Sequence, residues 1–387
     1  MELFNNLALG FDTAFTLQNL MYCFIGCLLG TLIGVLPGLG PVATIAMLLP
    51  ATYALPPIAA LIMLAGIYYG SQYGGSTTAI LLNIPGETSS VVTAIDGYQM
   101  AKNGRGGVAL FTAGMGSFFA GCVATLVLAA FAAPLTELAF KFGPAEYFSL
   151  MVLGLIGAVV LASGSLIKAI GMIILGLLMG LIGTDVNSGV ARYSFDIPQL
   201  SDGIGFVSVA IDVNSGVARY SFDIPQLSDG IGFVSVAMGV FGFAEIMGNL
   251  EKKEDEESFL NKVTSMIPTK NDLKRMVPSI LRGTTIGSVL GILPGGGAAL
   301  AAFGAYSVEK KSSKYTAEFG KGAIEGVAGP EAANNAAAQT SFIPLLTLGI
   351  PPNAVMALMV GAMTIHNIQP GPQVMTSNPT LFWGLIA

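Results

Sequence analysis

Long apolar runs constrain this chain more than any other feature of its sequence. Runs near the ~20 residues that a membrane-spanning helix requires recur along its length, at roughly 17–36, 54–70, 107–135, 143–163, 165–183, 231–248, 277–293 and 341–363. Charged residues make up only 10% of the chain, against about 25% in an ordinary soluble protein. The ~10-residue alternating segments of a membrane β-barrel are absent from the sequence. We therefore expect an all-α polytopic membrane protein.

The charged and metal-binding residue types argue against two other classes of function. The formal net charge is −6, and the few basic residues lie mainly between apolar runs, so no nucleic-acid partner is expected. The three cysteines, Cys23, Cys27 and Cys122, lie in apolar stretches, and His366 is the one histidine. Because this set does not supply the usual ligands of a zinc site, we expect no resident metal or other cofactor.

A charged segment at 249–276 interrupts the apolar pattern. Its basic residues are Lys252, Lys253, Lys262, Lys270, Lys274 and Arg275, and the positive-inside rule predicts a cytoplasmic loop. Smaller basic groups near 102–105 and 310–314 are predicted on the same side. The loop divides the chain into a first transmembrane repeat at 1–183, a duplicated loop segment with the following span at 184–248, and a second transmembrane repeat at 277–387.

Two copies of one 26-residue sequence, DVNSGVARYSFDIPQLSDGIGFVSVA, occupy Asp185–Ala210 and Asp212–Ala237. A diverged structural repeat keeps only a pattern, so we interpret exact identity as a recent tandem duplication or an error of sequence assembly, without a function of its own. The apolar run at 204–211 is far too short to span a membrane. We expect one copy to form a hairpin or displaced loop without inverting the topology downstream.

A second, diverged repetition places Pro-Gly sequences inside two apolar runs. GTLIGVLPGLG at Gly30–Gly40 reappears as GSVLGILPGGG at Gly287–Gly297, with six of the eleven positions identical. Proline removes a backbone donor and glycine relaxes the backbone, so each motif predicts a broken helix. One such motif on either side of a cytoplasmic loop is typical of a duplicated transporter fold.

Each motif is followed by a second segment of matching pattern. Residues Tyr73–Glu87 read YGGSTTAILLNIPGE, and residues Asn334–Asn353 read NNAAAQTSFIPLLTLGIPPN. Both segments pass from small polar residues through an apolar stretch to Ile-Pro and a polar residue. Each half is therefore predicted to contain two broken elements, as broken helices or re-entrant hairpins.

At membrane depth, a broken helix is tolerated only where protein or a water-filled cavity satisfies its free backbone groups. A half-helix that begins after Pro37 or Pro294 would direct free N–H groups and partial positive charge at an anion. The neighbouring glycines would let a carboxylate approach the backbone. The candidate substrate ligands are thus Pro37, Gly38, Gly40, Pro294, Gly295 and Gly297. The alternative is that these residues only kink helices and allow close packing, and the pairing of the motifs makes it the weaker interpretation.

Uncharged polar side chains near the breaks supply further candidates for substrate binding. They are Ser76, Thr77, Thr78, Asn83, Asn334, Asn335, Gln339, Thr340 and Ser341. Hydroxyls and amides bind carboxylates or coordinate cations, although serine and threonine in membrane helices often bond only to their own backbone. Amides at membrane depth are costly unless they are paired, so the asparagines and the glutamine favour a site.

Four acidic residues lie nearest these elements: Glu87, Asp96, Glu325 and Glu331. We take Glu87 and Glu331 as candidates for coupling to a sodium ion or a proton. Each is alternatively a loop carboxylate in water.

The same segments resemble the large membrane subunit of the tripartite tricarboxylate transporters, the TctA family. The resemblance rests on GTLIGVLPGLGP, YYGSQYGGSTTAILLNIPGE, DGYQMAKNGRGG, LGILPGGGAALAAFGAY and GPEAANNAAAQTSFIPLLTLGIPPN, and it covers nearly the whole chain outside the extra copy. It implies a multi-pass transporter of the bacterial inner membrane with two inverted repeats and an elevator-like movement of the broken elements.

The resemblance also implies partners and an energy source. The partners are a small membrane subunit and a periplasmic solute-binding protein, which delivers a carboxylate, citrate in the namesake case. Uptake is then a symport driven by an ion gradient. The sequence contains no G-x-x-x-x-G-K-[ST] phosphate loop, which agrees with a secondary transporter.

Two features depart from the family pattern. The chain stops at NPTLFWGLIA, inside what the resemblance implies is another membrane segment, so we expect the second repeat to be incomplete. The exact duplication is the other departure. A channel, a carrier for another organic anion and a membrane-embedded enzyme are the alternatives, and the lack of a paired acid and base in a spanning segment argues against the enzyme.

Overall fold

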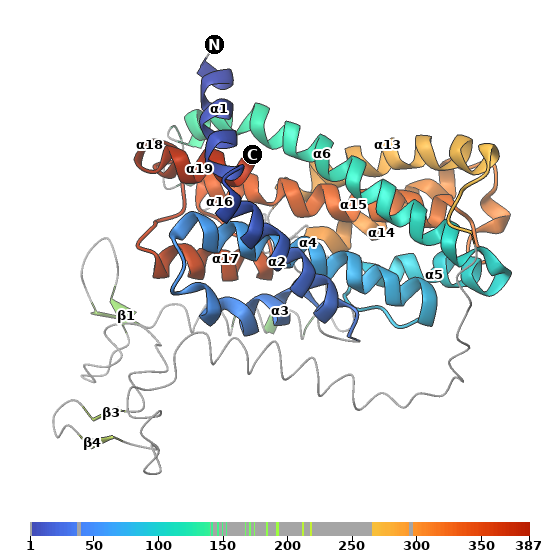
Figure 1. The fold of residues 1–387 in the computed structure, drawn as a ribbon, viewed down its shortest axis with the longest axis horizontal. Coiled ribbons are helices and arrows are strands. Elements are labelled where there is room, and N and C mark those ends of the chain that lie inside the picture. Colours follow the sequence, from blue (N-terminus) through green and yellow to red (C-terminus); the bar gives the residue numbers. More distant parts are fainter. Residues whose placement is uncertain are drawn as a thin grey trace. The chain divides into compact units, whose positions relative to one another are not determined.

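The computed structural model describes residues 2–36, 40–139, 265–293 and 297–387, the isolated residues 141, 145–146, 149, 152, 167, 170–171 and 174, and the pairs 183–184, 191–192, 211–212 and 217–218. The described chain is mostly helical (Figure 1), which confirms the predicted all-α class. Two compact units are present, one formed by Met1–Ala158 with Glu245–Ala387 and the other by Val159–Ala244.

The elements of the larger unit fall on either side of the charged segment. Before it lie α1 (Glu2–Ala14), α2 (Leu17–Gly34), α3 (Pro41–Leu48), η1 (Leu49–Thr52), α4 (Pro57–Leu82), α5 (Ser90–Met100), the π-turn η2 (Ala101–Arg105) and α6 (Gly106–Ala139). Helix α13 (Lys270–Ile292) begins within the last residues of that segment, and after it lie α14 (Gly297–Ser312), η5 (Thr316–Glu318), α15 (Glu325–Thr340), α16 (Phe342–Leu348), α17 (Ala354–Ile365), α18 (Val374–Ser377) and α19 (Pro379–Ile386). Helices of the two groups pack together, with α13 and α15 lying along α6 (Figure 1).

Two helical stretches among the described residues are long and apolar enough to cross a membrane, Leu17–Gly34 and Ser90–Glu137. Helix α4 extends well beyond the predicted run at 54–70, and in its polar second half the hydroxyls of Ser71 and Thr78 bond to carbonyls of the same helix. The predicted run at 341–363 is divided into α16 and α17 by Gly349 and the two following prolines. The predicted runs at 143–163, 165–183 and 231–248 lie largely or wholly outside the described residues.

Glycines bring the paired helices of each half into backbone contact. On α2, a Cβ atom added at Gly30 would overlap the carbonyl oxygen of Ile67 on α4. On α13, a Cβ atom added at Gly287 would overlap the carbonyl oxygen of Ala333 on α15. Gly30 and Gly287 hold the same place in the two Pro-Gly motifs, so the diverged repeat preserves a packing contact as well as a break.

The second broken segments also end alike. Asn83 ends α4 in the left-handed region at φ 59°, and Gly349 ends α16 at φ 72°. In each case the following isoleucine donates its N–H to a carbonyl six residues earlier, from Ile84 to Thr78 and from Ile350 to Pro344. Helices commonly end at a residue in the left-handed region, and in both halves this residue directly precedes Ile-Pro.

The smaller unit contains the duplicated sequence. The strands β1 (Gly183–Thr184) and β2 (Ala191–Arg192) pair antiparallel, as do β3 (Ile211–Asp212) and β4 (Val217–Ala218). Thr184 pairs with Ala191 and Ile211 pairs with Ala218, which are equivalent positions of the two copies. A hairpin therefore forms in the same register at the start of each copy, although we expected one in a single copy.

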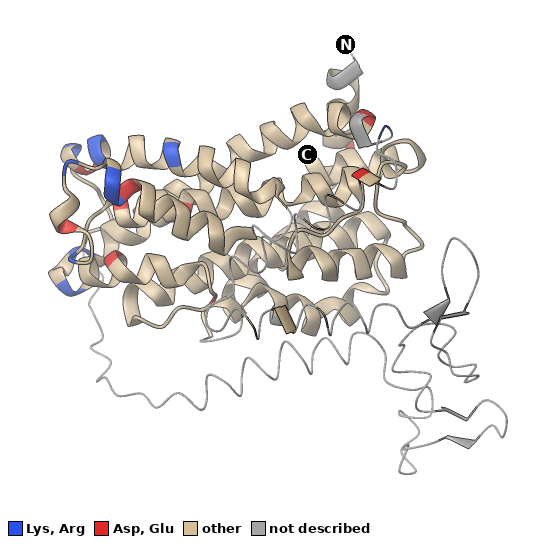
Figure 2. Ribbon diagram, turned by 180° about the vertical axis from the view of Figure 1, so that it is seen from behind, with Lys and Arg blue, Asp and Glu red and all other residues tan. Residues whose placement is uncertain are grey.

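Basic residues gather at one end of the larger unit. Figure 2 shows most of the lysines and arginines at this end, where η2 joins α5 to α6, α13 begins and α14 ends. The arginines are paired here: Arg105 bonds Asp272, and Arg282 bonds Glu309. The structure thus brings the basic residues near 102–105 and 310–314 together with Lys270, Lys274 and Arg275, while Lys252, Lys253 and Lys262 lie outside the described residues.

Candidate functional site

Both Pro-Gly motifs interrupt helices as predicted. Helix α2 ends at Gly34 and α3 begins at Pro41, and α13 ends at Ile292 and α14 begins at Gly297. Gly40 is buried at the start of α3, and Gly297 is buried with φ +59°. Pro37, Gly38, Pro294 and Gly295 lie outside the described residues.

The chain at the end of α2 packs against the NIPGE segment at 83–87 through backbone atoms. The Gly86 N–H donates to the Gly75 carbonyl at 3.4 Å. A Cβ atom on Gly86 would lie 2.5 Å from Gly75 Cα and 2.6 Å from the Gly34 carbonyl oxygen. Only glycine permits such close approach of three backbone segments. The arrangement fixes the backbone directly before Glu87, whose side chain is buried.

Glu331 on α15 is buried, with 1% of its surface exposed. Its Oε1 accepts hydrogen bonds from Ser76 on α4, at 2.8 Å, and from Thr93 on α5. Its Oε2 accepts one from Ser117 on α6 at 3.4 Å. Three helices of the first half thus direct hydroxyls at one carboxylate of the second half.

The carboxylate of Glu87 also accepts hydrogen bonds from uncharged side chains. Its Oε1 accepts from the Ser89 hydroxyl and, at 3.3 Å, from the side-chain amide of Asn334, which lies one turn beyond Glu331. Asn335 donates to Ser117 at 2.7 Å and to the Glu331 carbonyl at 3.1 Å. We call Ser76, Glu87, Ser89, Thr93, Ser117, Glu331, Asn334 and Asn335 the carboxylate cluster.

The other predicted polar residues lie apart from these contacts. The hydroxyls of Thr77, Thr78, Thr340 and Ser341 bond to carbonyls three or four residues earlier in their own chain segments. Asn83 is exposed and caps α4. These five residues stay candidates on sequence grounds, and none of them forms a hydrogen bond to the carboxylate cluster in the described part of the chain.

A cavity of about 800 Å³ lies beside the carboxylate cluster. Ser117 and Asn335 belong to both, and Gln339, Tyr69 and Tyr73 line the cavity further out, together with apolar side chains of α6. The buried hydroxyl of Tyr69 has no hydrogen-bond partner among the described residues. The cavity therefore offers uncharged donors next to buried carboxylates.

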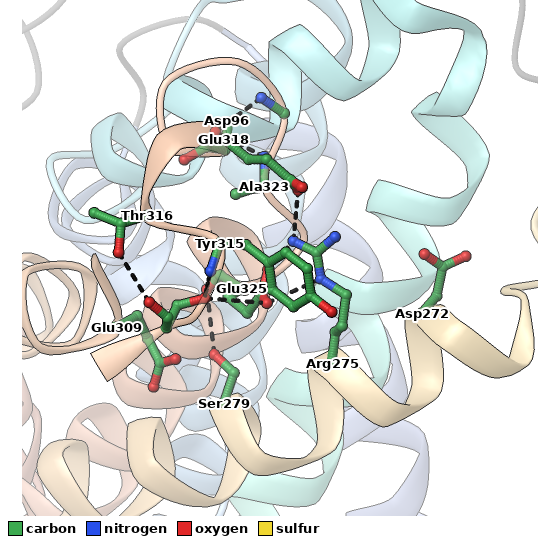
Figure 3. A network of polar contacts seen from close by, with 12 residues as sticks. Asp96, Asp272, Arg275, Ser279, Glu309, Tyr315, Thr316, Glu318, Ala323 and Glu325 are labelled. Atoms are coloured by element: carbon green, nitrogen blue, oxygen red, sulfur yellow. Dashed lines mark hydrogen bonds and ion pairs between the residues drawn. The ribbon is translucent and has the colours of Figure 1, made fainter. Parts of the chain in front are cut away.

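Asp96 and Glu325, the other two acidic residues near the breaks, take part in a separate network at the basic end (Figure 3). Asp96 Oδ1 accepts from the N–H groups of Gly320, Gly322 and Ala323, at 2.8–2.9 Å. Arg275 bonds both oxygens of Glu325 at 2.9 and 2.6 Å and also reaches Glu318 (Figure 3). These contacts connect separate chain segments. We therefore assign a structural role to Asp96 and Glu325.

Sequence reasoning missed three members of the carboxylate cluster, Ser89, Thr93 and Ser117. Thr93 and Ser117 lie in apolar surroundings on α5 and α6, 238 and 214 residues from Glu331. The only sign of Thr93 and Ser117 in the sequence is that each places a hydroxyl inside an apolar run. It is weak, since most such hydroxyls bond to their own helix, as Thr112 does on α6.

Comparisons with known proteins agree with the motifs. The sequence model of the Tripartite tricarboxylate transporter TctA family matches residues 20–213 and 206–387. The chain is 57% identical over 387 residues to an "Uncharacterized 52.8 kDa protein in TAR-I ttuC' 3'region" of Agrobacterium vitis, with 100% of this chain and 72% of that protein covered. It is 72% identical over 101 residues to an "Uncharacterized protein in TAR-II ttuC' 3'region" of the same organism, with 26% and 42% covered. No solved structure matches.

Proposed function

Because the chain belongs to the tripartite tricarboxylate transporter TctA family, we propose that it carries out secondary active uptake of a tricarboxylate or related carboxylate across the bacterial inner membrane. The observation that carries this proposal is the carboxylate cluster, which lies where the broken elements of the two halves meet. A buried polar site between two broken, duplicated elements is the arrangement in which transporters bind substrates and coupling ions.

The proposal assigns roles to the candidate residues. Gly38, Gly40, Gly295 and Gly297 contact the substrate carboxylates through the backbone, next to Pro37 and Pro294. Ser76, Asn334, Asn335 and Gln339 provide hydroxyl and amide donors, and Glu87 and Glu331 couple uptake to an ion gradient. Support comes from the burial of the two glutamates and from the cavity that Asn335 and Gln339 line.

Family membership supports the remaining parts of the proposal. The chain is the large subunit of a tripartite system, with a small membrane subunit and a periplasmic solute-binding protein as partners. Its two halves are inverted repeats, and the broken elements move in an elevator-like manner. The basic end of the larger unit faces the cytoplasm, because basic residues are retained on that side.

Uptake into proteoliposomes tests this function. Vesicles with the full chain and both partner subunits should accumulate labelled citrate or another carboxylate only when the binding protein and an imposed sodium or proton gradient are present. Uptake without the binding protein and without any gradient would instead indicate a channel and contradict the proposal.

Two substitutions test the proposed backbone contacts. Gly38→Val and Gly295→Val should each abolish carboxylate binding while the protein still inserts into the membrane, because a branched side chain blocks approach to the backbone. Binding is measured calorimetrically on purified protein. Normal affinity in both variants would mean that the motifs only pack helices.

A further inference from the structure

We propose that the carboxylate cluster is a sodium-binding site in which Glu331 is the anionic ligand. The inference rests on the proposed function and goes beyond it by choosing the ion and naming its ligands. Three features of the cluster carry it: its oxygen ligands and, as far as the described residues go, the lack of a basic partner for Glu331 and one buried acceptor without a donor.

The ligand atoms are of the kind that a hard cation prefers. Two carboxylate oxygens of Glu331 and the hydroxyl oxygens of Ser76, Thr93 and Ser117 converge from α15, α4, α5 and α6. Hard cations bind carboxylate, hydroxyl and carbonyl oxygens in sites of several ligands. A hydroxyl that donates to a carboxylate rotates to present a lone pair when a cation enters.

Among the described residues, no basic side chain forms an ion pair with Glu331. The ion pairs among the described residues involve Asp272, Glu309, Glu318 and Glu325, all at the basic end. A carboxylate with 1% exposure whose side-chain hydrogen bonds within the described residues come from neutral hydroxyls is costly to keep ionised. A bound monovalent cation neutralises its charge and removes that cost.

The Asn334 side chain provides the independent observation. It is 1% exposed, and its Nδ2 points at Glu87, so the amide is directed into the cluster. Its Oδ1 has no hydrogen-bond partner among the described residues. Because buried acceptors are normally satisfied, an unpartnered amide oxygen on a side chain that contacts Glu87 points to a ligand with positive charge.

The same oxygen atom favours sodium over a proton. A proton on Glu331 would need one carboxylate oxygen and would leave Asn334 Oδ1 unsatisfied. A sodium ion uses several oxygens at once, neutral ones included. Divalent ions are disfavoured because they prefer several carboxylates in direct contact, and the three hydroxyls converge on one carboxylate.

Thermal unfolding of the purified full chain tests the site without measuring transport. At fixed pH and ionic strength and without substrate, Tm should rise and saturate as sodium chloride replaces choline chloride, since an ion that binds only the folded state stabilises it. Potassium chloride serves as the comparison salt. Glu331→Gln should abolish the sodium-dependent rise.

Conservative variants keep the test decisive if Glu331→Gln does not fold. Thr93→Val should weaken the apparent sodium affinity by about ten-fold or more. Thr112→Val is the matched control, because Thr112 is equally buried but bonds only to the Val108 carbonyl, and its sodium response should equal that of the unmodified protein.

Three outcomes would overturn the proposal: a Tm indifferent to sodium, an unchanged sodium response in Thr93→Val, or a Tm that responds to pH alone, which would indicate a proton site. These results separate the ion site from the transport function. A sodium response without carboxylate uptake would overturn only the proposed function, and gradient-driven uptake indifferent to sodium would overturn only the sodium site.

Discussion

Asp272 shows how a single residue anchors the start of a helix at the basic end. Its carboxylate accepts from the N–H and hydroxyl of Thr269 in a capping box, and Arg105 of the first half binds it as well. Burial raises the pKa of Asp272, but the hydrogen bonds from Thr269 and the charge of Arg105 outweigh burial and hold that pKa below its ordinary value. The ionised form of Asp272 therefore stabilises the folded state.

We predict that Asp272→Asn lowers the free energy of unfolding at neutral pH by about 1 kcal/mol, the usual contribution of a helix cap. A depressed pKa stabilises the fold above the unfolded-state value near ~4 and ceases to do so as pH falls through the folded-state value. The difference in Tm between the unmodified protein and the variant should therefore narrow below about pH 4. A pH-independent difference would show that ionisation of Asp272 is irrelevant.

At the scale of elements, the glycine contacts between α2 and α4 and between α13 and α15 determine how closely each helix pair packs. Gly26, Gly30 and Gly34 each lie against a carbonyl of α4, and Gly283, Gly287 and Gly291 each lie against a carbonyl of α15. Small residues at such spacing let membrane helices approach through their backbones. The close packing of α4 on α2 and of α15 on α13 in turn fixes the helices that carry Ser76 and Glu331.

We predict that Gly30→Ala and Gly287→Ala each lower stability by about 1–3 kcal/mol, because the new methyl group overlaps a backbone oxygen that cannot turn away. Gly121→Ala on α6 is the control, since nothing lies within 4 Å of a Cβ atom there. It should stabilise the protein by up to about 1 kcal/mol, from helix propensity alone. Thermal unfolding in detergent measures all three, and equal effects would contradict the packing argument.

The sequence predicts the elements of this protein better than its site. Helix breaks follow from local chemistry, so the Pro-Gly motifs and the Ile-Pro segments locate four helix ends. Glu87 and Glu331 are found because acidic residues are rare near apolar runs. Thr93 and Ser117 are not found, because their relation to Glu331 depends on how α5 and α6 pack against α15, and no local pattern encodes that packing.

At the scale of the whole molecule, polar contacts join the two halves of the larger unit both at the carboxylate cluster and at the basic end. Glu331 contacts three helices of the first half, and Asp96 on α5 bonds the backbone between η5 and α15. Lys310, Lys311, Lys314 and Lys321 remain exposed near this end. These lysines therefore report which side of the membrane the basic end faces.

We predict that trypsin cleaves after Lys314 and Lys321 in inside-out membrane vesicles and spares both sites in right-side-out vesicles, because the positive-inside rule places them in the cytoplasm. Mass spectrometry of the released peptides identifies the cleavage sites. Detergent-solubilised protein, in which both sides are accessible, is the control. Cleavage only in right-side-out vesicles would reverse the proposed orientation.

The hydrogen bonds of Glu331 also have a consequence for biosynthesis. Thr93 is made 238 residues before the glutamate that it contacts, and at ribosomal speeds that distance takes on the order of 10 to 50 s. During that interval the hydroxyls of Ser76, Thr93 and Ser117 enter the membrane without their acceptor. Nascent α4, α5 and α6 thus depend on water, lipid head groups or the insertion machinery until α15 emerges, and a ribosome that stalls before residue 331 would release a bundle with an unfilled polar centre.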